Sequence, residues 1–481
     1  MSEIRLTAAW VAAAADGSIV SGDEAREFSG VSIDTRTIGA GELFIAIRGE
    51  RFDGAEFTDA AVTAGAAGVI VPRGRRATLR QAQGRPEQGR GTKASAERPV
   101  VIEVDDTTVA LQALAHAVRR ESGTKVVAIT GSAGKTTTKE VTSEFLASRY
   151  RVVRNRGNFN NHIGLPLSLI ELRQRPEIAV VELGMNHAGE ISTLVRVAEP
   201  EIRVWTNVGE AHLGFFASVD TIADAKAEIF EGATPSTLLV ANADDDRIAA
   251  RAGGFAGRVV TFGIDRAADV RAAAVVDRGI DGTSARVTTP RGDVDIATPL
   301  VGRGNLANIL AATAVAIECD VPLATVAERA AQLRPASHRG EIVRLATGVT
   351  VIDDSYNANP TAMRRALEVL ARADASRRIA VLGEMLELGD RASDLHAEVG
   401  RSAATSRVDL LFAVGGAPAA ALADAAVGAG MSRDRVRHVA TSELAADAVA
   451  AAVQRGDVVL VKGSRGVKTD RVVDRLKAEH A

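Results

Sequence analysis

The chain has 481 residues, which is too long for a single compact core and favours two to four domains. Hydrophobic residues make up 46% and charged residues 25%, as is typical of a soluble globular protein. A formal net charge of -3 and an aromatic content of 3% argue against a nucleic-acid-binding face, a basic membrane-binding face and base-stacking platforms.

The first predicted region covers residues 1–121 and contains two strand-like runs, VSIDTR (31–36) and LFIAIRG (43–49). It ends in a helical stretch rich in Ala and Leu. Residues 73–99 are dense in Arg, Gln and Gly and have almost no apolar residues, so we expect a disordered surface insertion. A nucleic-acid-binding loop is the alternative, although it would be one short basic segment on an acidic chain.

The second region, residues 122–335, alternates apolar runs with helical patterns such as TIADAKAEIFEG (221–232). Continuous apolar strands that alternate with helices predict a parallel sheet covered on both faces. The strands are expected in VVAIT (126–130), IAVVEL (178–183), IRVWTNV (202–208) and STLLVAN (236–242). Residues 302–318, GRGNLANILAATAVAIE, predict an amphipathic helix opened by a Gly-rich turn.

The third region, residues 336–481, repeats this alternation and predicts a second, smaller doubly wound sheet of Rossmann-like type. Its strands are expected in VTVIDD (349–354), RIAVLG (378–383), DLLFAVG (409–415) and DVVLVKG (457–463). The predicted fold is therefore α/β with three domains.

The single cysteine and the lack of long apolar segments indicate the compartment. Cys319 lies in the apolar run AVAIECDVP, where we expect a small buried hydrophobe, and one cysteine excludes a disulfide framework. The first residues carry charges where a signal peptide is apolar, and no window approaches the roughly 20 apolar residues that span a bilayer. We therefore expect a cytoplasmic protein without membrane insertion, and a monomer.

The stretch VVAITGSAGKTTTKEV is the most informative in the chain. An apolar strand enters a Gly-containing turn, and Lys135 and three threonines then open a helix. Backbone N–H groups at such a turn bind polyphosphate, a lysine neutralises the terminal phosphates, and a threonine hydroxyl ligates Mg²⁺. The candidate nucleotide-binding residues are Gly131, Ser132, Ala133, Gly134, Lys135, Thr136 and Thr137.

The spacing of this loop differs from the usual P-loop, which has four residues between its first glycine and Gly-Lys-Ser/Thr. Gly131 leaves only two residues before Gly134. A chance Gly-Lys-Thr after a strand is therefore the alternative.

Two polar residues follow other apolar strands, at the edge where open α/β sheets place ligands. Glu182 ends one run, and His212 comes shortly after another. With Thr136 they form a candidate metal site. Taken singly, a strand-end glutamate is more often solvated or capping, and a lone histidine is more often structural.

Six segments in order resemble the Mur ligases, over nearly the whole chain from about Ser32 to Lys462 apart from residues 73–99. They are AITGSAGKTTTKE, VVELGMNHAGEI, TNVGEAHLGFF, AKAEIF, GRGNLANILAA and DDSYNANP. The shortened phosphate loop is similar to the one this family uses. The resemblance implies ATP and Mg²⁺ as cofactors, phosphorylation of a carboxylate to an acyl phosphate, and its displacement by an amine. DDSYNANPTAM and LGEMLELGDRASDLH further resemble the members that join D-alanyl-D-alanine to UDP-N-acetylmuramoyl-tripeptide.

The resemblance assigns roles around the nucleotide. Lys135, His212 and Lys226 become the candidate catalytic residues, with Glu182, His212 and Thr136 as magnesium ligands. Lys226 resembles a lysine that several members carry as a carbamate, and the alternative is an ordinary surface lysine on a helix. Asn305, Asn308, Arg339 and Asp354 resemble contacts to ATP, and the alternative for Asn305 is a helix-opening role.

The resemblance also assigns substrate-binding residues, in the UDP-sugar-binding first domain, the loop NFNNHIG and the third domain, which is expected to bind D-alanyl-D-alanine. Ser32, Asp34 and Arg36 alternate along a strand end, which would point all three side chains the same way. The full set is Ser32, Asp34, Arg36, Asp53, Gly54, Asn158, Asn161, Asn357, Asn359 and Lys462.

Two alternatives to this function stay open. A different Mur ligase or a folate polyglutamate ligase would share the same ATP-using machinery, although the third domain lacks the Asp-Asn-Pro-Arg type motif of the ligase that adds the third residue. A nucleotide-binding regulatory protein would hold ATP without turnover. The presence of both Lys135 and Glu182 argues against the regulatory protein.

Overall fold

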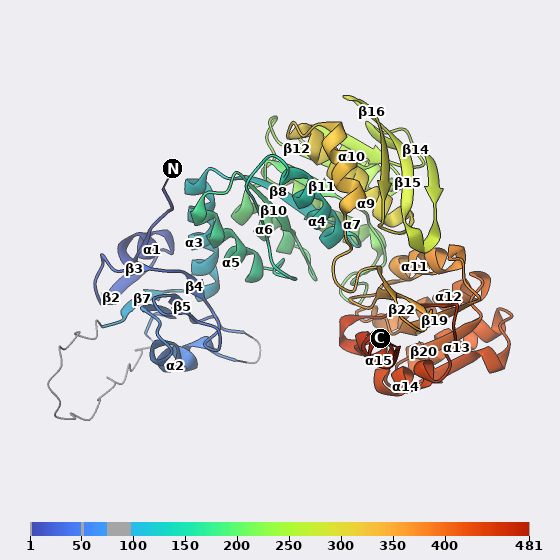
Figure 1. The fold of residues 1–481 in the computed structure, drawn as a ribbon. Helices are drawn as coiled ribbons and strands as arrows, with labels where there is room; N and C mark the ends of the chain where they lie inside the picture. The colour runs from blue at the N-terminus through green and yellow to red at the C-terminus, as the bar shows by residue number, and fades with distance from the viewer. Residues whose placement is uncertain (1, 50–51, 75–97, 481) are drawn as a thin grey trace. The chain divides into compact units, whose positions relative to one another are not determined.

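The computed structural model describes residues 2–49, 52–74 and 98–480 and has an α/β fold (Figure 1). Most of the expected insertion, residues 75–97, lies outside the described residues. The chain divides into two compact units. The first contains residues 1–126, 151–184 and 192–200, and the second contains residues 127–150, 185–191 and 201–481.

The first unit contains a five-stranded sheet in the order β2-β7-β6-β5-β4. Only β2 runs antiparallel to its neighbour. The strands are β2 (Ser18–Ser21), β4 (Val31–Ser32), β5 (Leu43–Ile45), β6 (Gly68–Pro72) and β7 (Val100–Val104). Two short strands, β1 (Leu6–Thr7) and β3 (Glu27–Phe28), pair beside α1 (Ala8–Ala14).

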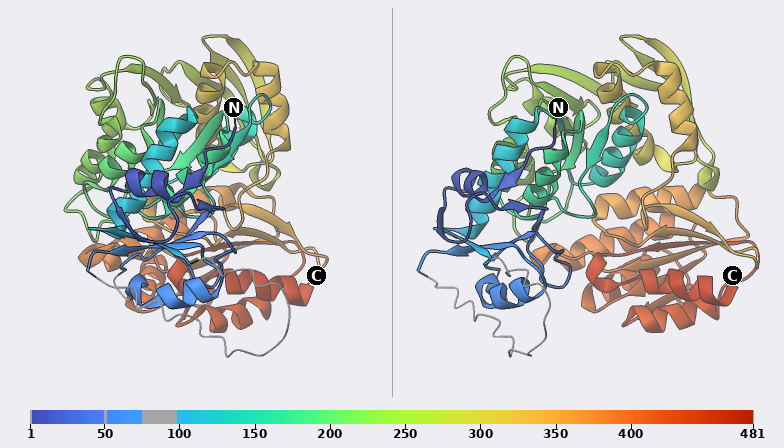
Figure 2. Two further views of the ribbon diagram at one scale, coloured as in Figure 1. Left: turned by 90° about the vertical axis from the view of Figure 1, so that its left-hand side faces the viewer. Right: turned by 60° about the vertical axis from the view of Figure 1, so that its left-hand side comes forward.

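Helices cover both faces of this sheet (Figures 1 and 2). Phe44, Val69 and Val71 pack against Ala61 of α2 (Thr58–Thr63), and α3 (Thr107–Ser122) lies over the opposite face. The Asp106 carboxylate caps α3 by accepting from two backbone N–H groups. The unit also contains α5 (Gly164–Ile170) and the parallel pair β9 (Val152–Arg154) and β10 (Ile178–Glu182), after which α6 (Glu190–Ala198) follows in the sequence.

The second unit contains strands in the order β16-β15-β14-β13-β12-β11-β8. The strands from β8 to β14 are parallel, whereas β14, β15 and β16 form an antiparallel meander that the apolar runs did not predict. The strands are β8 (Lys125–Thr130), β11 (Ile202–Trp205), β12 (Leu238–Asn242), β13 (Arg258–Gly263), β14 (Val270–Asp277), β15 (Thr283–Thr289) and β16 (Gly292–Thr298). The helices here are α4 (Lys135–Leu146), α7 (Val219–Ala227), α8 (Asp246–Ala252), α9 (Gly302–Glu318) and α10 (Leu323–Gln332).

The prediction of an amphipathic α9 is wrong. The helix already begins at Gly302, so its glycines lie in the first turn rather than before it. Residues 308–317 are all buried, because α9 packs among α4, α10 and the strands β12 to β15. A helix enclosed on every side needs no polar face.

The C-terminal part of the second unit has a six-stranded sheet, β17-β18-β22-β19-β20-β21, in which only β17 is antiparallel. Helices lie on both faces of this sheet, with α11, α12 and α13 on one and α14 and α15 on the other (Figure 1). Alternate residues of β19 face opposite cores: Ala380 and Leu382 belong to the core of the first face, and Ile379 and Val381 to that of the second. The predicted α/β class is thus confirmed. The elements are β17 (Glu341–Arg344), β18 (Thr350–Asp354), α11 (Pro360–Arg372), β19 (Arg377–Gly383), α12 (Ala392–Thr405), β20 (Leu410–Val414), α13 (Ala417–Gly428), β21 (Val436–Val439), α14 (Ser442–Ala450), β22 (Asp457–Lys462) and α15 (Asp470–His480).

Among the residues that the structure describes, no helix has the length and apolar character needed to cross a membrane.

Candidate active site

The phosphate loop, residues 131–137, connects β8 to α4 and depends on two glycines. Gly131 has φ +150° and Gly134 has φ +81°, a backbone range that side chains disfavour. A Cβ on Gly131 would lie 2.0 Å from Thr206 Oγ1, and one on Gly134 would lie 2.3 Å from Asn308 Oδ1. Gly134 is the N-cap of α4, so the loop delivers a bound anion to the positive end of a helix.

Asn207, which follows β11, holds the middle of this loop. Its Oδ1 accepts from the Ala133 backbone N–H at 2.8 Å, and its Nδ2 donates to the Ala133 carbonyl at 2.9 Å. Its own carbonyl accepts from the Ser132 N–H at 3.0 Å. Sequence reasoning missed Asn207, although it lies in the segment TNVGEAHLGFF that also contains His212. The loop is therefore shaped by the neighbouring strand.

Two asparagines of α9 lie behind the loop. Thr138 Oγ1 donates to Asn308 Oδ1 at 3.2 Å, and Asn308 Nδ2 donates to Asn305 Oδ1 at 3.3 Å. Asn305 Nδ2 in turn donates to the carbonyl of Val301 at 2.9 Å. Asn308 is buried, so this placement favours a role in supporting α4 and Gly134.

Two lysines lie close enough to interact at this site. The Lys135 ammonium donates to the Gly131 carbonyl at 2.9 Å and so folds back along the loop. Lys226 on α7 is 1% exposed, which excludes the alternative of an ordinary surface lysine. Burial lowers the pKa of the Lys226 amine well below its ordinary value, and the positive charge of Lys135 lowers it further. Lys226 is thus biased toward the neutral amine.

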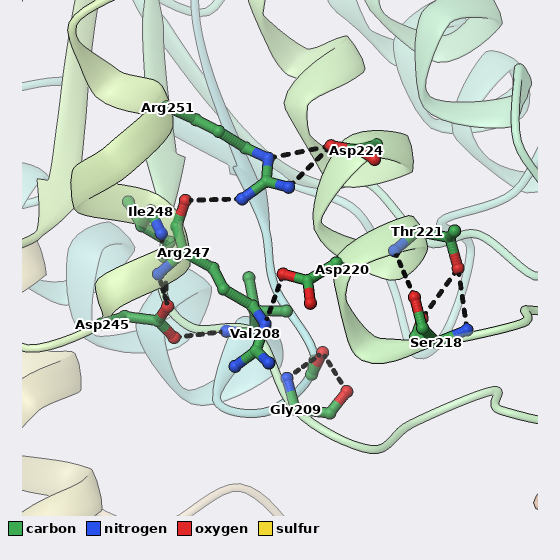
Figure 3. Close-up of polar contacts among 11 residues, drawn as sticks. Val208, Gly209, Ser218, Asp220, Thr221, Asp224, Asp245, Arg247, Ile248 and Arg251 are labelled. Carbon is green, nitrogen blue, oxygen red and sulfur yellow. Dashed lines mark hydrogen bonds and ion pairs between the residues drawn. The ribbon is translucent and has the colours of Figure 1, made fainter.

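Ion pairs fix the helix that carries Lys226. Figure 3 shows Arg247 and Arg251 of α8 reaching Asp220 and Asp224 of α7, at 3.0 and 2.7 Å. At the start of α7, Ser218 and Thr221 exchange hydrogen bonds in a capping box.

Asp245 connects this helix pair to the loop after β11. One carboxylate oxygen caps α8, and the other accepts from the Val208 N–H at 2.7 Å (Figure 3). The same α7–α8 pair therefore supports both Lys226 and the segment that leads to His212.

The loop after β11 also contacts the C-terminal part of the second unit. His212 has φ +64°, and its Nδ1 lies 2.7 Å from Glu387 Oε2. The hydrogen bond with His212 holds the pKa of Glu387 below its ordinary value, against the effect of burial. Two residues earlier, Glu210 pairs with Arg364 at 2.8 Å and accepts from Thr361 at 3.1 Å.

The remaining predicted residues of the second unit gather near the end of β18. The Arg339 guanidinium stacks over the Tyr356 ring, 4.1 Å from its centroid. Lys462 is buried and pairs with Asp354 at 2.7 Å. Its ammonium also donates to the Asn357 carbonyl at 2.9 Å.

Asn359 joins this cluster to the phosphate loop. Its Oδ1 caps α11 through the Ala362 N–H at 2.8 Å, while its Nδ2 lies 3.5 Å from the Ser132 carbonyl. The C-terminal residues therefore reach the phosphate loop within one compact unit.

In the first unit, the predicted alternation of Ser32, Asp34 and Arg36 is wrong, because β4 ends at Ser32 and a turn follows. The Asp34 carboxylate accepts from the backbone N–H of Arg36 and pairs with its guanidinium at 2.6 Å. The Arg36 hydrogen bonds lower the pKa of Asp34 to about 2. A turn closed by its own side chains replaces the expected extended strand end.

The other candidates of the first unit shape turns. Asp53 caps a short 3₁₀ turn through the Ala55 N–H at 3.0 Å, and a Cβ on Gly54 would lie 2.6 Å from the Ile47 carbonyl oxygen. Asn161 accepts from the Gly164 N–H at the start of α5, at 2.8 Å, and Asn158 is exposed.

Glu182, also in the first unit, ends β10 and is 4% exposed. Its Oε1 accepts from Asn160 Nδ2 at 2.8 Å, and its backbone N–H donates to Asn155 Oδ1 at 3.0 Å. Asn155 was absent from the predicted residues, whereas Asn160 lies in the loop NFNNHIG that the resemblance assigned to substrate binding. Over the described ranges, no group of three or more His, Cys, Asp and Glu residues is arranged to hold a metal ion.

Comparisons with known proteins cover nearly the whole chain. The Mur ligase catalytic, middle and glutamate ligase domain models match residues 27–119, 129–316 and 338–465. UDP-N-acetylmuramoyl-tripeptide–D-alanyl-D-alanine ligase from Bacillus subtilis is 34% identical over 448 residues, which cover 93% of each chain. The chain belongs to the Mur ligase family. The ligase of the same name from Mycobacterium tuberculosis is 36% identical over 99% of this chain and 98% of its own.

Solved Mur ligases share the fold. MurF from Acinetobacter baumannii superposes with a TM-score of 0.86 at 29% identity, covering 99% of this chain and all of its own. MurF from Thermotoga maritima in complex with ADP gives 0.78 at 27% identity, covering 94% of this chain and 97% of its own. A folylpolyglutamate synthase from Mycobacterium tuberculosis gives 0.60 at 18% identity, which shows likeness of fold alone.

Proposed function

We propose that this Mur ligase joins D-alanyl-D-alanine to UDP-N-acetylmuramoyl-tripeptide and consumes ATP, releasing ADP and phosphate. The proposal is carried by the similarity of this chain to ligases of this activity. They are 34–36% identical to it and cover at least 93% of its length. The product is the UDP-muramoyl pentapeptide precursor of peptidoglycan. Because its substrates are ATP and a UDP-linked precursor, we place the enzyme in the cytoplasm. We also propose that it acts as a monomer.

The reaction divides into two steps. The terminal carboxylate of the tripeptide attacks the γ-phosphorus of ATP, which forms an acyl phosphate and releases ADP. The amine of D-alanyl-D-alanine then attacks the acyl carbon, loses a proton and expels phosphate, which leaves the new amide bond. Phosphoryl transfer needs positioning and charge stabilisation more than covalent help from the protein.

The phosphate loop suits the first step. The N-terminus of α4 and the Lys135 ammonium place positive charge where the terminal phosphates of ATP would lie. Asn207 already holds the loop in shape, so less ordering is left for ATP to drive. Within this assignment Asn305 and Asn308 support the loop, and Arg339 and Asp354 approach the nucleotide from the C-terminal part.

Magnesium fits the residues that the resemblance assigned to it. The Thr136 hydroxyl stands at the second position of α4, and His212 uses Nδ1 toward Glu387, so Nε2 is the nitrogen left for a metal. Glu182 is a buried carboxylate and belongs to the first unit. That it binds the same ion as Thr136 and His212 stays a prediction. When bound, Mg²⁺ neutralises phosphate charge.

Lys226 suits carbamylation. CO₂ reacts with neutral amines, and the buried Lys226 amine is biased toward that form. A carbamate would replace this amine with an anion beside Lys135. It would remove the repulsion that a protonated Lys226 exerts on Lys135. It would also place a negative charge beside the Lys135 ammonium.

The substrates are assigned to separate parts of the chain. We propose three domains with boundaries near residues 121 and 335. The first binds the UDP-sugar through Ser32, Asp34, Arg36, Asp53 and Gly54, aided by Asn158 and Asn161. Peptide substrate is bound by Asn357, Asn359 and Lys462. Hydrogen bonds from Lys462 to Asp354 and Asn357 hold this group together, which supports the assignment.

The test is phosphate release by the purified protein with ATP, Mg²⁺, UDP-N-acetylmuramoyl-tripeptide and D-alanyl-D-alanine, omitting one component at a time. Release is expected only when all four are present. Turnover with glutamate or a diamino acid in place of the dipeptide would assign a different ligase. Absence of turnover in every mixture would overturn the proposal in favour of a nucleotide-binding protein.

A further inference from the structure

Two loops of the second unit meet at Glu387. One is the loop after β11, which carries His212 and Gly214, and the other follows β19. Glu387 contributes two acceptors to this junction: its Oε2 lies 2.7 Å from His212 Nδ1, and its backbone carbonyl accepts from the Gly214 N–H at 2.7 Å. Space is tight beside it, because a Cβ on Gly389 would lie 3.0 Å from Gly214 Cα.

Both residues of the side-chain pair have a disfavoured backbone. His212 has φ +64° and Glu387 has φ +63°, the left-handed region that costs free energy for any residue with a Cβ. Such conformations persist where the surroundings hold them, and they concentrate at functional sites. Here a backbone hydrogen bond stabilises each conformation. The Phe215 N–H donates to the His212 carbonyl at 2.9 Å, and the N–H of Leu386, next to Glu387, donates to Ser464 Oγ at 2.9 Å.

The pair contributes little to stability by its charge alone. The His212 side chain is 19% exposed and that of Glu387 is 47% exposed, and solvent screens ion pairs of this kind. Its chemical consequence is more specific. A carboxylate only accepts hydrogen bonds, so Nδ1 of His212 must carry the proton, and in the neutral ring the lone pair is then on Nε2.

We propose that Glu387 is a positioning residue: it fixes the Nδ1–H tautomer and the ring direction of His212, and so leaves Nε2 as the nitrogen that would bind a metal. The proposal rests on the proposed function, in which His212 is a magnesium ligand. Partners of this kind behind a ligand histidine raise metal affinity, and their loss costs roughly 10- to 100-fold.

A second contact between the same two parts of the unit provides the matched control. Glu210, two residues before His212, pairs with Arg364 at 2.8 Å, and this ion pair does not involve the His212 ring. If Glu387 only clamps the two parts together, Arg364→Ala should reproduce the effect of Glu387→Ala. If Glu387 orients His212, Arg364→Ala should leave the histidine unchanged.

The first experiment is histidine-selective ¹⁵N NMR of the full chain without metal, at mildly alkaline pH, with the His212 signals assigned by their loss in His212→Asn. The wild-type protein and Arg364→Ala should show the Nδ1–H tautomer. Glu387→Ala should show a mixture with Nε2–H, and Glu387→Gln should restore the wild-type pattern, because its amide oxygen still accepts. An unchanged tautomer in Glu387→Ala overturns the proposal, whatever the enzyme's activity.

The second experiment measures Mn²⁺ affinity by electron paramagnetic resonance with a non-hydrolysable ATP analogue. Glu387→Ala should weaken Mn²⁺ binding by about 10-fold or more, and Glu387→Gln by much less. Arg364→Ala should change it less than about 2-fold, since it removes a partly exposed ion pair that does not involve the His212 ring. Equal weakening in Glu387→Ala and Arg364→Ala would overturn the positioning role. Failure of the proposed ligase activity would appear separately, as missing phosphate release in the wild-type protein.

Discussion

Asn207 holds Ala133 of the phosphate loop with both ends of its side-chain amide, accepting at 2.8 Å and donating at 2.9 Å. The two residues are 74 positions apart in the sequence, so the geometry of a nucleotide-binding loop depends on a neighbouring strand. Nucleotide affinity should therefore depend on a residue that need not touch ATP.

Asn207→Ala should weaken binding of an ATP analogue by about 10-fold and lower the free energy of unfolding by about 1–3 kcal/mol, because the half-buried Ala133 N–H loses its side-chain acceptor and the Ala133 carbonyl loses one of its two donors. Calorimetric titration and denaturant unfolding measure the two effects. Asn242 is a matched control: it is equally buried, and its amide donates to the Thr206 carbonyl. Asn242→Ala should lose similar stability with a smaller loss of affinity, and equal losses of affinity would contradict the specific role of Asn207.

Gly134→Ala should abolish nucleotide binding, because the new Cβ would lie 2.3 Å from Asn308 Oδ1 at φ +81°. Gly123 has φ +68°, and a Cβ there would have no atom within 4 Å, so Gly123→Ala adds backbone strain without a clash. That control should cost about 1–2 kcal/mol of stability and keep full nucleotide affinity. Thermal shift with and without ADP separates the two variants, and an intact ADP shift in Gly134→Ala would refute the prediction.

Lys226→Met should stabilise the fold in CO₂-free buffer at neutral pH. The folded-state pKa of Lys226 is lowered, so between that pKa and the unfolded value the unfolded chain binds more protons, and wild-type stability rises with pH. The advantage of the methionine variant should therefore shrink toward about pH 10.4, the ordinary lysine pKa. Unfolding curves from about pH 7 to about pH 9.5, below that ordinary pKa, measure this, and a gap that widens with pH would contradict it.

Carbamylation of Lys226 gives a separate prediction. Removal of CO₂ should lower ligase activity, and bicarbonate should restore it, because the carbamate returns an anion beside Lys135. With ¹³C-labelled bicarbonate, a carbamate signal should appear in the wild-type protein and be absent in Lys226→Met. A signal of equal size in both proteins would place the modification elsewhere.

Local patterns predicted much of this fold. The apolar run before Gly131 and the glycines within the turn indicated a strand, a turn and a helix, since these signals act between near neighbours. In the same way, alternation of apolar strands with helices predicted the parallel C-terminal sheet. The burial of α9 was missed, because a Gly- and Asn-rich start suggests an exposed face, whereas tertiary packing encloses the helix.

The candidate site was less predictable, because its order comes from pairs that are distant in sequence. Glu387 lies 175 positions from His212, and no periodicity links them. The prediction of an extended strand end at Asp34 and Arg36 was wrong for the opposite reason. Their turn is a local structure, but the short strand before it suggested that the extended backbone continues. Side-chain hydrogen bonds of Asp in turns compete with extended structure, and here they stabilise the turn over an extended strand.

The most direct test of the central claim is the mass of the nucleotide product when equal amounts of D-alanyl-D-alanine, D-glutamate, L-lysine and diaminopimelate compete for UDP-N-acetylmuramoyl-tripeptide in the presence of ATP and Mg²⁺. A D-alanyl-D-alanine ligase gives one dominant product, heavier than the tripeptide substrate by D-alanyl-D-alanine less one water. A product that carries any other amine, or an unchanged tripeptide beside an ADP-bound protein, would contradict this claim.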